Sequence, residues 1–345
     1  MATSPHCASV PSRPSSPWPP QRRRPVVAEL IRSGVVTVGE TMALLAAERT
    51  GPLSHVPSMS VGVGGAESNV AIALQRLGVP ATWIGRVGED SFGKLVLREL
   101  RAEGLDVRGI VDPAAPTGLM VKERRTARSL GVWYYRAGSA GSRLRPEDIP
   151  EGVLTHAALL HVTGITPALS DSAAEAVRHA IELARRHGMT VSFDVNYRSK
   201  LWSREAAGKG LLDIVRACDV VFAGPEEASL FVPEEEDPHT LASALCDLGP
   251  SQAVIKLGAQ GCAAVIDGEQ YSRPAVKVDV VDSVGAGDAF VAGYLAELLA
   301  DAPPTVRLDT AVTTGGFACT VPGDWEGLPT RAELGILGSA EDVIR

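Results

Sequence analysis

Cysteine is scarce in this chain, and its cysteines are far apart. There are five among 345 residues. They form no CxxC pair, and no neighbouring histidine stands at the spacing of a metal ligand, so neither a disulfide framework nor a structural zinc site is expected. Reduced thiols are typical of cytosolic proteins, and we expect a cytoplasmic location. The five are Cys7, Cys218, Cys246, Cys262 and Cys319.

Long apolar runs and a surplus of positive charge are also absent. No stretch approaches the roughly 20 apolar residues that a membrane-spanning helix needs. The formal net charge of −8 argues against a general nucleic-acid or anionic-membrane surface. We therefore expect neither nucleic acid nor a membrane as a partner, and an anionic ligand would need a local group of arginines. Since 45% of the 345 residues are hydrophobic, the chain can bury a large core.

The first residues differ in composition from the rest. Residues 1 to about 25 are rich in Pro, Ser and Arg and lack the apolar core of a signal peptide. We expect a disordered tail over residues 1–30, or a mis-assigned start, followed by one folded domain over residues 31–340.

Residues 282–290 (DSVGAGDAF) predict a phosphate-binding turn. Residues 270–281 alternate like a strand, and residues 289–299 carry apolar side chains at helical spacing. Gly285 and Gly287 can adopt positive φ and let the backbone approach a ligand closely. Because the N–H groups of a first helical turn are unpaired, an anionic oxygen is stabilised there. The turn is therefore expected between a strand and a helix.

Asp288 within this turn is a candidate general base. Its charge would repel a bound anion, so a purely anion-binding turn does not explain it. A carboxylate there could take a proton from an attacking hydroxyl while the backbone amides of Gly285, Ala286 and Gly287 hold the developing phosphoryl charge. The alternative is a tight turn followed by an N-capping Asp.

Strand and helix patterns alternate along the chain. Helix patterns cover 67–77, 91–103 and 172–187, each closed by glycine, and Ser172 with Glu175 predicts a capping box on the third. This alternation indicates an α/β fold with a mainly parallel sheet covered on both faces, whose active site lies at the carboxyl ends of the strands. The expected strands are 35–40, 81–85, 158–162, 190–194, 220–223 and 253–257.

Two stretches interrupt the alternation. Residues 53–64 and 117–136 have the pattern of β-ribbons rather than crossover units. Together they would form a small lid over the main sheet, which suits phosphoryl transfer because excluding water prevents loss of the phosphate to hydrolysis. Exposed ribbons often pair between subunits, so we expect a homo-oligomer formed through the lid strands.

Two motifs resemble the signatures of the ribokinase-like, or PfkB, carbohydrate kinases. The first covers 64–71 (GGAESNVA), 77–78 (LG) and 85–93 (GRVGEDSFG), and the second is 282–290. The resemblance spans residues 34–335 and implies a three-layer α/β/α fold with a β lid, ATP and Mg²⁺ as cofactors, and a monovalent cation such as K⁺ near the Asp282–Ser283 turn. P-loop kinases are excluded as a template, because no GxxxxGK[ST] follows a strand.

Within this family the chain resembles most the 2-keto-3-deoxygluconate kinases. The supporting segments are 134–140 (YYRAGSA), 164–169 (GITPAL), 194–198 (DVNYR) with 201–202 (LW), and 323–329 (GDWEGLP). The resemblance implies ATP-dependent phosphorylation of the primary hydroxyl of a sugar acid, giving 2-keto-3-deoxy-6-phosphogluconate.

A sugar acid needs a partner for its carboxylate. Arginine binds carboxylates through charge-assisted hydrogen bonds, and Arg136 and Arg198 stand at matching positions. A lone arginine is more commonly in a surface ion pair, and Asn69 or Tyr134 taken alone could be a helix cap or a core aromatic. The other substrate-binding residues that the resemblance implies are Gly65, Asn69, Tyr134, Ile165 and Asp324.

On the nucleotide side, residues 256–261 (KLGAQG) match the family's strand-to-turn segment beside ATP, although alone they are only a strand ending in a turn. Nucleotide contacts are thus expected at Lys256, Gly258, Gly261, Gly285 and Gly287. Glu227 matches the acidic residue that helps to place Mg²⁺ through water.

Two positions depart from the family pattern. Gly224 replaces the asparagine that precedes the acidic residue. Met120 stands where a lid tyrosine is common, which removes a hydroxyl from the sugar pocket and weakens discrimination. A fructokinase, ribokinase or other ketose kinase is therefore the alternative function, and a non-catalytic nucleotide or sugar sensor is a second one.

Overall fold

A computed structural model of the chain describes Met1 and residues 33–126 and 129–338. The tail predicted for residues 1–30 lies outside the described residues apart from Met1. The description below concerns the compact unit Arg32–Arg345. No helix in the described ranges has both the length and the apolar character of a membrane span.

The main sheet has nine strands in the order β13-β12-β11-β10-β9-β8-β1-β4-β5. All neighbours from β11 to β5 pair in parallel, whereas β12 and β13 are antiparallel at one edge. The strands are β1 (Val35–Val38), β4 (Ala81–Gly88), β5 (Asp106–Asp112), β8 (Leu159–Thr163), β9 (Thr190–Asp194), β10 (Val220–Ala223), β11 (Gln252–Lys256), β12 (Cys262–Ile266) and β13 (Glu269–Arg273).

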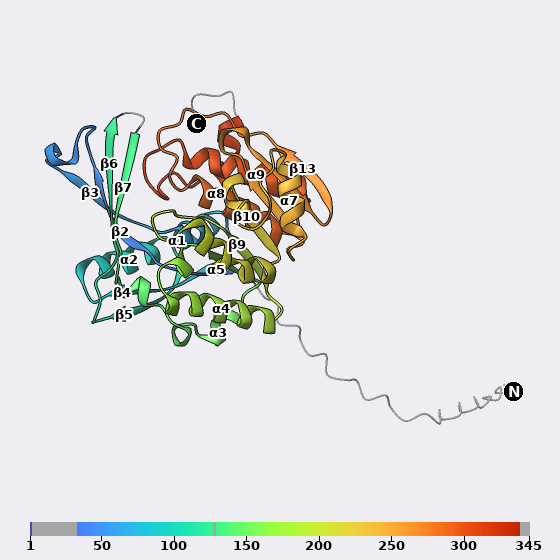
Figure 1. Cartoon of the computed structure of the whole chain (residues 1–345). Helices are drawn as coiled ribbons and strands as arrows, with labels where there is room; N and C mark the ends of the chain where they lie inside the picture. The colour runs from blue at the N-terminus through green and yellow to red at the C-terminus, as the bar shows by residue number, and fades with distance from the viewer. Residues whose placement is uncertain (2–32, 127–128, 339–345) are drawn as a thin grey trace. The chain divides into compact units, whose positions relative to one another are not determined.

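Helices cover both faces of this sheet (Figure 1). Side chains alternate along a strand, so Val35 of β1 packs in one core cluster and Val36 in the other. The first cluster includes α1, α2, α8 and α9, and the second includes α4, α5 and α7. The predicted three-layer α/β/α fold is confirmed. The helices are α1 (Ala66–Arg76), α2 (Ser91–Ala102), α3 (Glu151–Leu154), α4 (Asp171–Arg186), α5 (Arg204–Ala217), α6 (Pro225–Ala228), α7 (Pro238–Cys246), α8 (Ala286–Leu299) and α9 (Pro304–Ala318).

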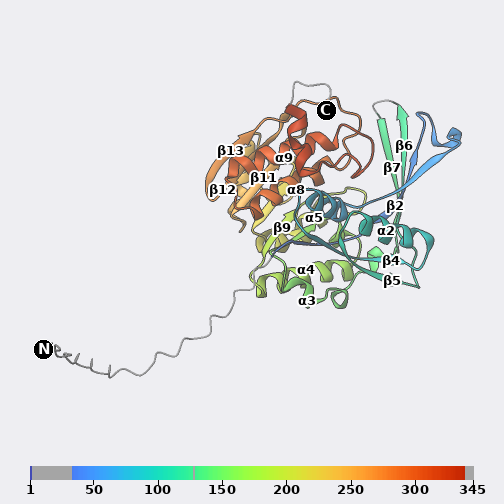
Figure 2. The same ribbon diagram turned by 180° about the vertical axis from the view of Figure 1, so that it is seen from behind.

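A second sheet has four strands in the order β3-β2-β6-β7. Figures 1 and 2 show these strands side by side, separate from the main sheet. One member, β2, was not predicted, and the predicted ribbon over 53–64 forms a strand only from Met59, because a 3₁₀ helix over Leu53–His55 and Pro57 come first. The strands are β2 (Met42–Ala47), β3 (Met59–Gly64), β6 (Leu119–Thr126) and β7 (Ser129–Tyr135). We call this sheet the lid.

Two local predictions are wrong. The strand expected over 270–281 ends at Arg273, because Pro274 has no N–H with which to continue the ladder. An irregular segment therefore leads to the turn before α8. Helix α4 is capped by Ser170, whose hydroxyl accepts the Ala173 N–H at 3.1 Å, so the capping box predicted at Ser172 does not form.

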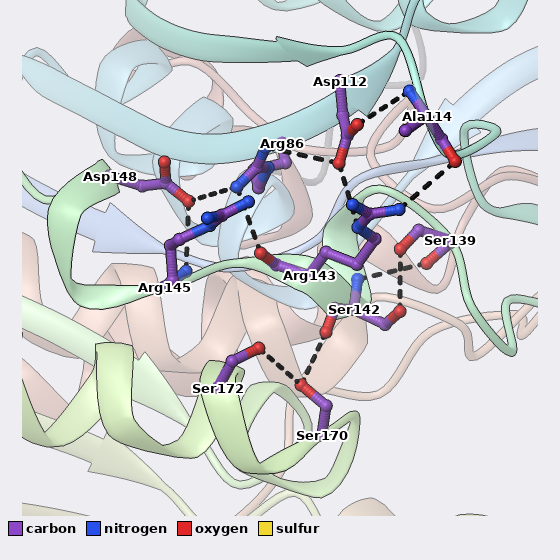
Figure 3. A network of polar contacts seen from close by, with 10 residues as sticks. All are labelled: Arg86, Asp112, Ala114, Ser139, Ser142, Arg143, Arg145, Asp148, Ser170 and Ser172. Atoms are coloured by element: carbon purple, nitrogen blue, oxygen red, sulfur yellow. Dashed lines mark hydrogen bonds and ion pairs between the residues drawn. The ribbon is translucent and has the colours of Figure 1, made fainter.

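A buried ion-pair network fixes the segment after the lid to the main sheet (Figure 3). Arg86 of β4 lies 3.0 Å from Asp148 and 3.3 Å from Asp112 at the end of β5, and Arg143 lies 3.2 Å from Asp112. Arg86 and Asp112 each have two oppositely charged partners, so the network orients this segment against the main sheet. Ser139, in the same segment, donates a hydrogen bond to Glu40, which lines the candidate active site.

Candidate active site

The predicted phosphate-binding turn forms the N-terminus of α8. Gly285 is the N-cap residue with φ +77°, and a Cβ there would lie 2.0 Å from the carbonyl oxygen of Asp324. Both the backbone conformation and the space therefore require glycine. Asp288 lies inside the first turn of the helix, so the alternative of an N-capping Asp is wrong.

Asp288 is a buried carboxyl held by a side chain of another helix. Its Oδ2 accepts a hydrogen bond of 2.8 Å from Nδ2 of Asn69 in α1, and 9% of the residue is exposed. Burial, chiefly, raises the pKa of Asp288 to about 7; nearby Asp194 raises it further, and the Asn69 bond lowers it. A carboxyl with a pKa near neutrality is well suited to general-base catalysis.

Asn69 also offers an acceptor to the site. Its Oδ1 is buried and has no hydrogen-bond partner among the described residues. Buried polar atoms in proteins are nearly always hydrogen-bonded. Asn69 lines a cavity beside the turn, which we call the main cavity. A hydroxyl donor of a ligand fits this position.

The main cavity, of about 780 Å³, lies at the carboxyl ends of the parallel strands. It brings together every residue predicted on the sugar side, along with residues of the turn and of the predicted metal position. These are Gly65, Asn69, Tyr134, Arg136, Ile165, Arg198, Asp324, Glu227, Lys256, Gly285, Gly287 and Asp288.

A second cavity, of about 540 Å³, adjoins the first, and Lys256 and Gly287 line both. It contains the other predicted nucleotide-side residues, Gly258 and Gly261, together with Ala286. Its remaining wall is largely apolar, with Val276, Val278, Val280, Phe290 and Val312. An apolar slot that opens onto a phosphate-binding turn fits a purine base with its phosphates directed toward the turn.

Lys256 places a positive charge where the two cavities meet. Its Nζ lies 2.7 Å from both carboxylate oxygens of Asp194, and a Cβ on Gly287 would lie 3.8 Å from it. Burial alone would lower the pKa of Lys256, but the carboxylates of Asp194, Glu227 and Asp288 raise it overall. The ammonium is therefore charged beside the turn.

The two candidate arginines differ in their environment. Arg136 is buried and donates to Oε2 of Glu40 from Nε at 2.7 Å, so a surface ion pair is ruled out for it. Ser139 donates to the other oxygen of Glu40. Arg198 is exposed at the cavity, and its guanidinium has no hydrogen bond or ion pair within the described ranges. Arg198 is thus the arginine whose charge is available to a ligand.

Sequence reasoning missed five charged residues that line the main cavity: Glu40, Glu67, Lys122, Asp194 and Glu226. Asp194 had a detectable signal, since it ends a predicted parallel strand. Glu67 accepts hydrogen bonds of 2.7 Å from Thr163 and Thr166, and burial raises its pKa. Glu67 stands in the first family motif and Glu226 precedes Glu227, but no local pattern marks either as a cavity residue. Glu40 and Lys122 have no local signal, because their partners are remote in the sequence.

A metal ion at this site would have to bind largely through water and phosphate. No cluster of three or more His, Cys, Asp or Glu suited to a metal occurs in the described part of the chain. Glu227 accepts the backbone N–H groups of Tyr197 at 2.8 Å and Gly224 at 2.7 Å. Mg²⁺ commonly keeps several waters and uses few carboxylates, so Glu227 and Asp194 fit Mg²⁺ carried by a nucleotide.

Comparison with known proteins is consistent with this geometry. Residues 32–331 match the pfkB family carbohydrate kinase model. The chain is 39% identical over 306 residues to 2-dehydro-3-deoxygluconokinase of Thermoproteus tenax, covering 87% of this chain and 92% of the relative. It is 36% identical over 313 residues to the enzyme of the same name from Bacillus subtilis, covering 90% and 96%. The chain belongs to the pfkB family of carbohydrate kinases.

The chain is also similar to solved structures. A putative ribokinase II from E. coli in complex with ATP and Mg²⁺ is 25% identical, with a TM-score of 0.81, covering 88% of this chain and 98% of that one. The prediction of an ATP-dependent carbohydrate kinase is confirmed at the level of the pfkB family.

The raised pKa of Asp288 predicts a specific pH dependence of stability. The folded state binds this proton more tightly than the unfolded state, so the stabilisation is complete below the ordinary pKa of 3.8 and is lost as the pH rises through about 7. Asp288→Asn cannot ionise. Its free energy of unfolding, relative to wild type, should therefore increase by roughly 2–4 kcal/mol from pH 4 to pH 8. Urea unfolding of both proteins across this range measures it, and parallel profiles would contradict the shifted pKa.

Proposed function

We propose that this protein transfers the γ-phosphoryl group of ATP to the primary hydroxyl of 2-keto-3-deoxygluconate, the sugar acid also called 2-dehydro-3-deoxygluconate, giving 2-keto-3-deoxy-6-phosphogluconate. The observation that carries the proposal is Asp288, a buried carboxyl with a raised pKa at a glycine turn, facing a cavity that contains two arginines. The two relatives named 2-dehydro-3-deoxygluconokinase support the choice of substrate.

The proposed reaction uses the chain's own residues in a simple order. Asn69 orients Asp288, which accepts the proton of the sugar hydroxyl as the oxygen attacks. The N–H groups of Gly285, Ala286 and Gly287 and the ammonium of Lys256 stabilise the charge on the transferred group. Bound Mg²⁺ would neutralise phosphate charge, and Glu227 and Asp194 are the residues placed to hold it through water. The lid excludes water from the cavity.

Recognition of the acid is assigned to Arg198, with Arg136 as a second contact. The guanidinium of Arg198 lines the cavity, lowers the pKa of Asp288 through its charge and has no hydrogen bond or ion pair within the described ranges, whereas the charge of Arg136 is already compensated by Glu40. Tyr134 stacks near Arg136, 5.8 Å from ring centroid to guanidinium carbon. Gly65, Asn69, Ile165 and Asp324 would complete the sugar-binding wall.

The proposed function predicts the outcome of a panel of acceptors assayed with ATP and Mg²⁺. 2-Keto-3-deoxygluconate should be phosphorylated with a higher kcat/KM than fructose, other neutral ketoses or ribose. Asp288→Asn should bind ATP and sugar acid normally but lose about 10²–10⁴-fold in kcat, the usual contribution of a general base. Near-normal turnover by this variant would exclude Asp288 as the base, and ATP binding without product from any acceptor would favour a sensor.

One observation favours the ketose alternative. Met120 is buried and packs with Met42 and Leu44, so the lid presents an apolar surface where a hydroxyl is common in relatives of the sugar-acid class. A preference for a neutral ketose in the acceptor panel would support this alternative over the sugar acid.

The role assigned to Arg198 predicts a change in discrimination. Arg198→Met should lower kcat/KM for the sugar acid by roughly 10–100-fold, because hydrogen bonds to charged groups contribute about 1.5–3 kcal/mol. Turnover of a neutral ketose should change little. Arg98→Met, at an exposed arginine paired with Glu99, is the matched control. Equal losses for acid and neutral acceptors would show that Arg198 does not bind the carboxylate.

The lid is the proposed contact between subunits of a homo-oligomer. Its edge strand β7 exposes Trp133 (53%) and Tyr135 (66%), and β3 exposes Val61 (58%). Exposed apolar groups at a sheet edge favour pairing with a second copy. Light scattering coupled to size exclusion should show an oligomer for wild type and a monomer for Tyr135→Glu. Val306→Glu, at an exposed valine of α9, is the control, and a monomeric wild type would refute the proposal.

Two further expectations stay predictions. Asp282, beside which a monovalent cation such as K⁺ is expected, has Arg124 at 3.8 Å and Lys122 at 4.0 Å. A cytoplasmic location is supported by the four cysteines that the structure describes, all of which are free thiols.

A further inference from the structure

The inner face of lid strand β6 carries two cations that no motif explains. Alternate residues of a strand face the same side, which places Met120, Lys122 and Arg124 in one row. Met120 and Lys122 line the main cavity. Lys122 is only 4% exposed. Lysine is rarely buried unless an opposite charge pairs with it.

These cations contact two carboxylates that flank the phosphate-binding turn. Nζ of Lys122 is in an ion pair with Oδ1 of Asp324 and lies 4.0 Å from Oδ2 of Asp282. Arg124 lies 3.8 Å from the same oxygen of Asp282. Lid strand β6 is thus connected to the residue that begins the turn and to the C-terminal segment that covers it.

Both carboxylate residues are tightly coupled to the turn itself. Asp282 accepts the backbone N–H of Val284 at 3.1 Å and that of Gly323 at 3.4 Å. The backbone of Asp324 packs directly on Gly285, where a Cβ would come within 2.0 Å of its carbonyl oxygen. A shift of either residue would therefore displace the N–H groups that face the phosphate.

Lys122 favours the ionised form of Asp324. Burial raises the pKa of Asp324, and Lys122 opposes this increase. Removing the ammonium would leave Asp324 buried without its ion-pair partner, with Arg124 as the remaining cation beside Asp282, an arrangement that favours reorientation of Asp324.

We propose that Lys122 is a positioning residue that connects the lid to the phosphate-binding turn through Asp324 and Asp282. Sugar binding against the lid then orders the turn for phosphoryl transfer. This inference rests on the proposed function, which supplies the sugar and the transferred phosphate.

A double-mutant cycle on kinase activity tests the connection. Lys122→Met and Asp324→Asn should each lower kcat/KM for the sugar acid by about 10–100-fold, with kcat reduced at saturating sugar, and the double variant should lose little more than Asp324→Asn alone. Lys122→Arg should restore part of the activity. Lys209→Met removes an exposed lysine paired with Glu205 and should match wild type. Additive losses, or a lower Tm with unchanged kcat, would overturn the proposal.

Hydrogen exchange of the ligand-free protein gives a readout that does not depend on activity. Lys122→Met should accelerate amide exchange both in lid residues 119–126 and in turn residues 282–288, whereas Lys209→Met should change neither. Faster exchange confined to the lid would overturn the proposal. If wild type phosphorylates no acceptor, the proposed function fails, and the exchange measurement still decides the connection between lid and turn.

Discussion

The site depends on one buried hydrogen bond, from Asn69 Nδ2 to Asp288 Oδ2. The two residues are 219 positions apart, and the bond joins the first turns of α1 and α8, which pack together on one face of the main sheet. Each helix begins beside a glycine that no other residue could replace without a clash, Gly65 against the backbone of Glu40 and Gly285 against that of Asp324. The close approach of these two helix starts places a carboxyl at the phosphate-binding turn and buries it enough to raise its pKa.

Most charges around this bond are compensated within the protein. Arg136 is paired with Glu40, Lys256 with Asp194, and Lys122 with Asp324. Such pairs contribute little net stability once desolvation is counted, but they fix side chains in one arrangement before a ligand arrives. By contrast, the guanidinium of Arg198 has no hydrogen bond or ion pair within the described ranges. Its charge is therefore available to bind an added anion.

The resemblance to the pfkB kinases predicted many of the residues that line the two cavities. Local sequence predicted the turn and the alternation of strands and helices, because glycine conformation and hydrophobic periodicity are local properties. It could not predict the pairs that organise the site. Glu40 lies between β1 and β2, and Arg136 follows β7, 96 positions further along, so only the folded topology brings them together. Local errors also had local causes: Pro274 ended a strand whose alternation continued beyond it, and Ser170 rather than Ser172 capped α4.

Met120 is the residue that argues most against a sugar acid as the substrate. The free energy lost with the missing hydroxyl is small, however, compared with that of a charged contact. A lost hydroxyl removes one neutral hydrogen bond, which contributes about 0.5–1.5 kcal/mol, whereas a carboxylate bound by a guanidinium gains about 1.5–3 kcal/mol. The charged contact is also the one that a neutral ketose cannot reproduce. Discrimination between the two classes of acceptor therefore depends more on Arg198 than on position 120. On the same face of β6, Lys122 holds Asp324 at the cavity wall, so the lid still presents an oriented acceptor to the sugar hydroxyls.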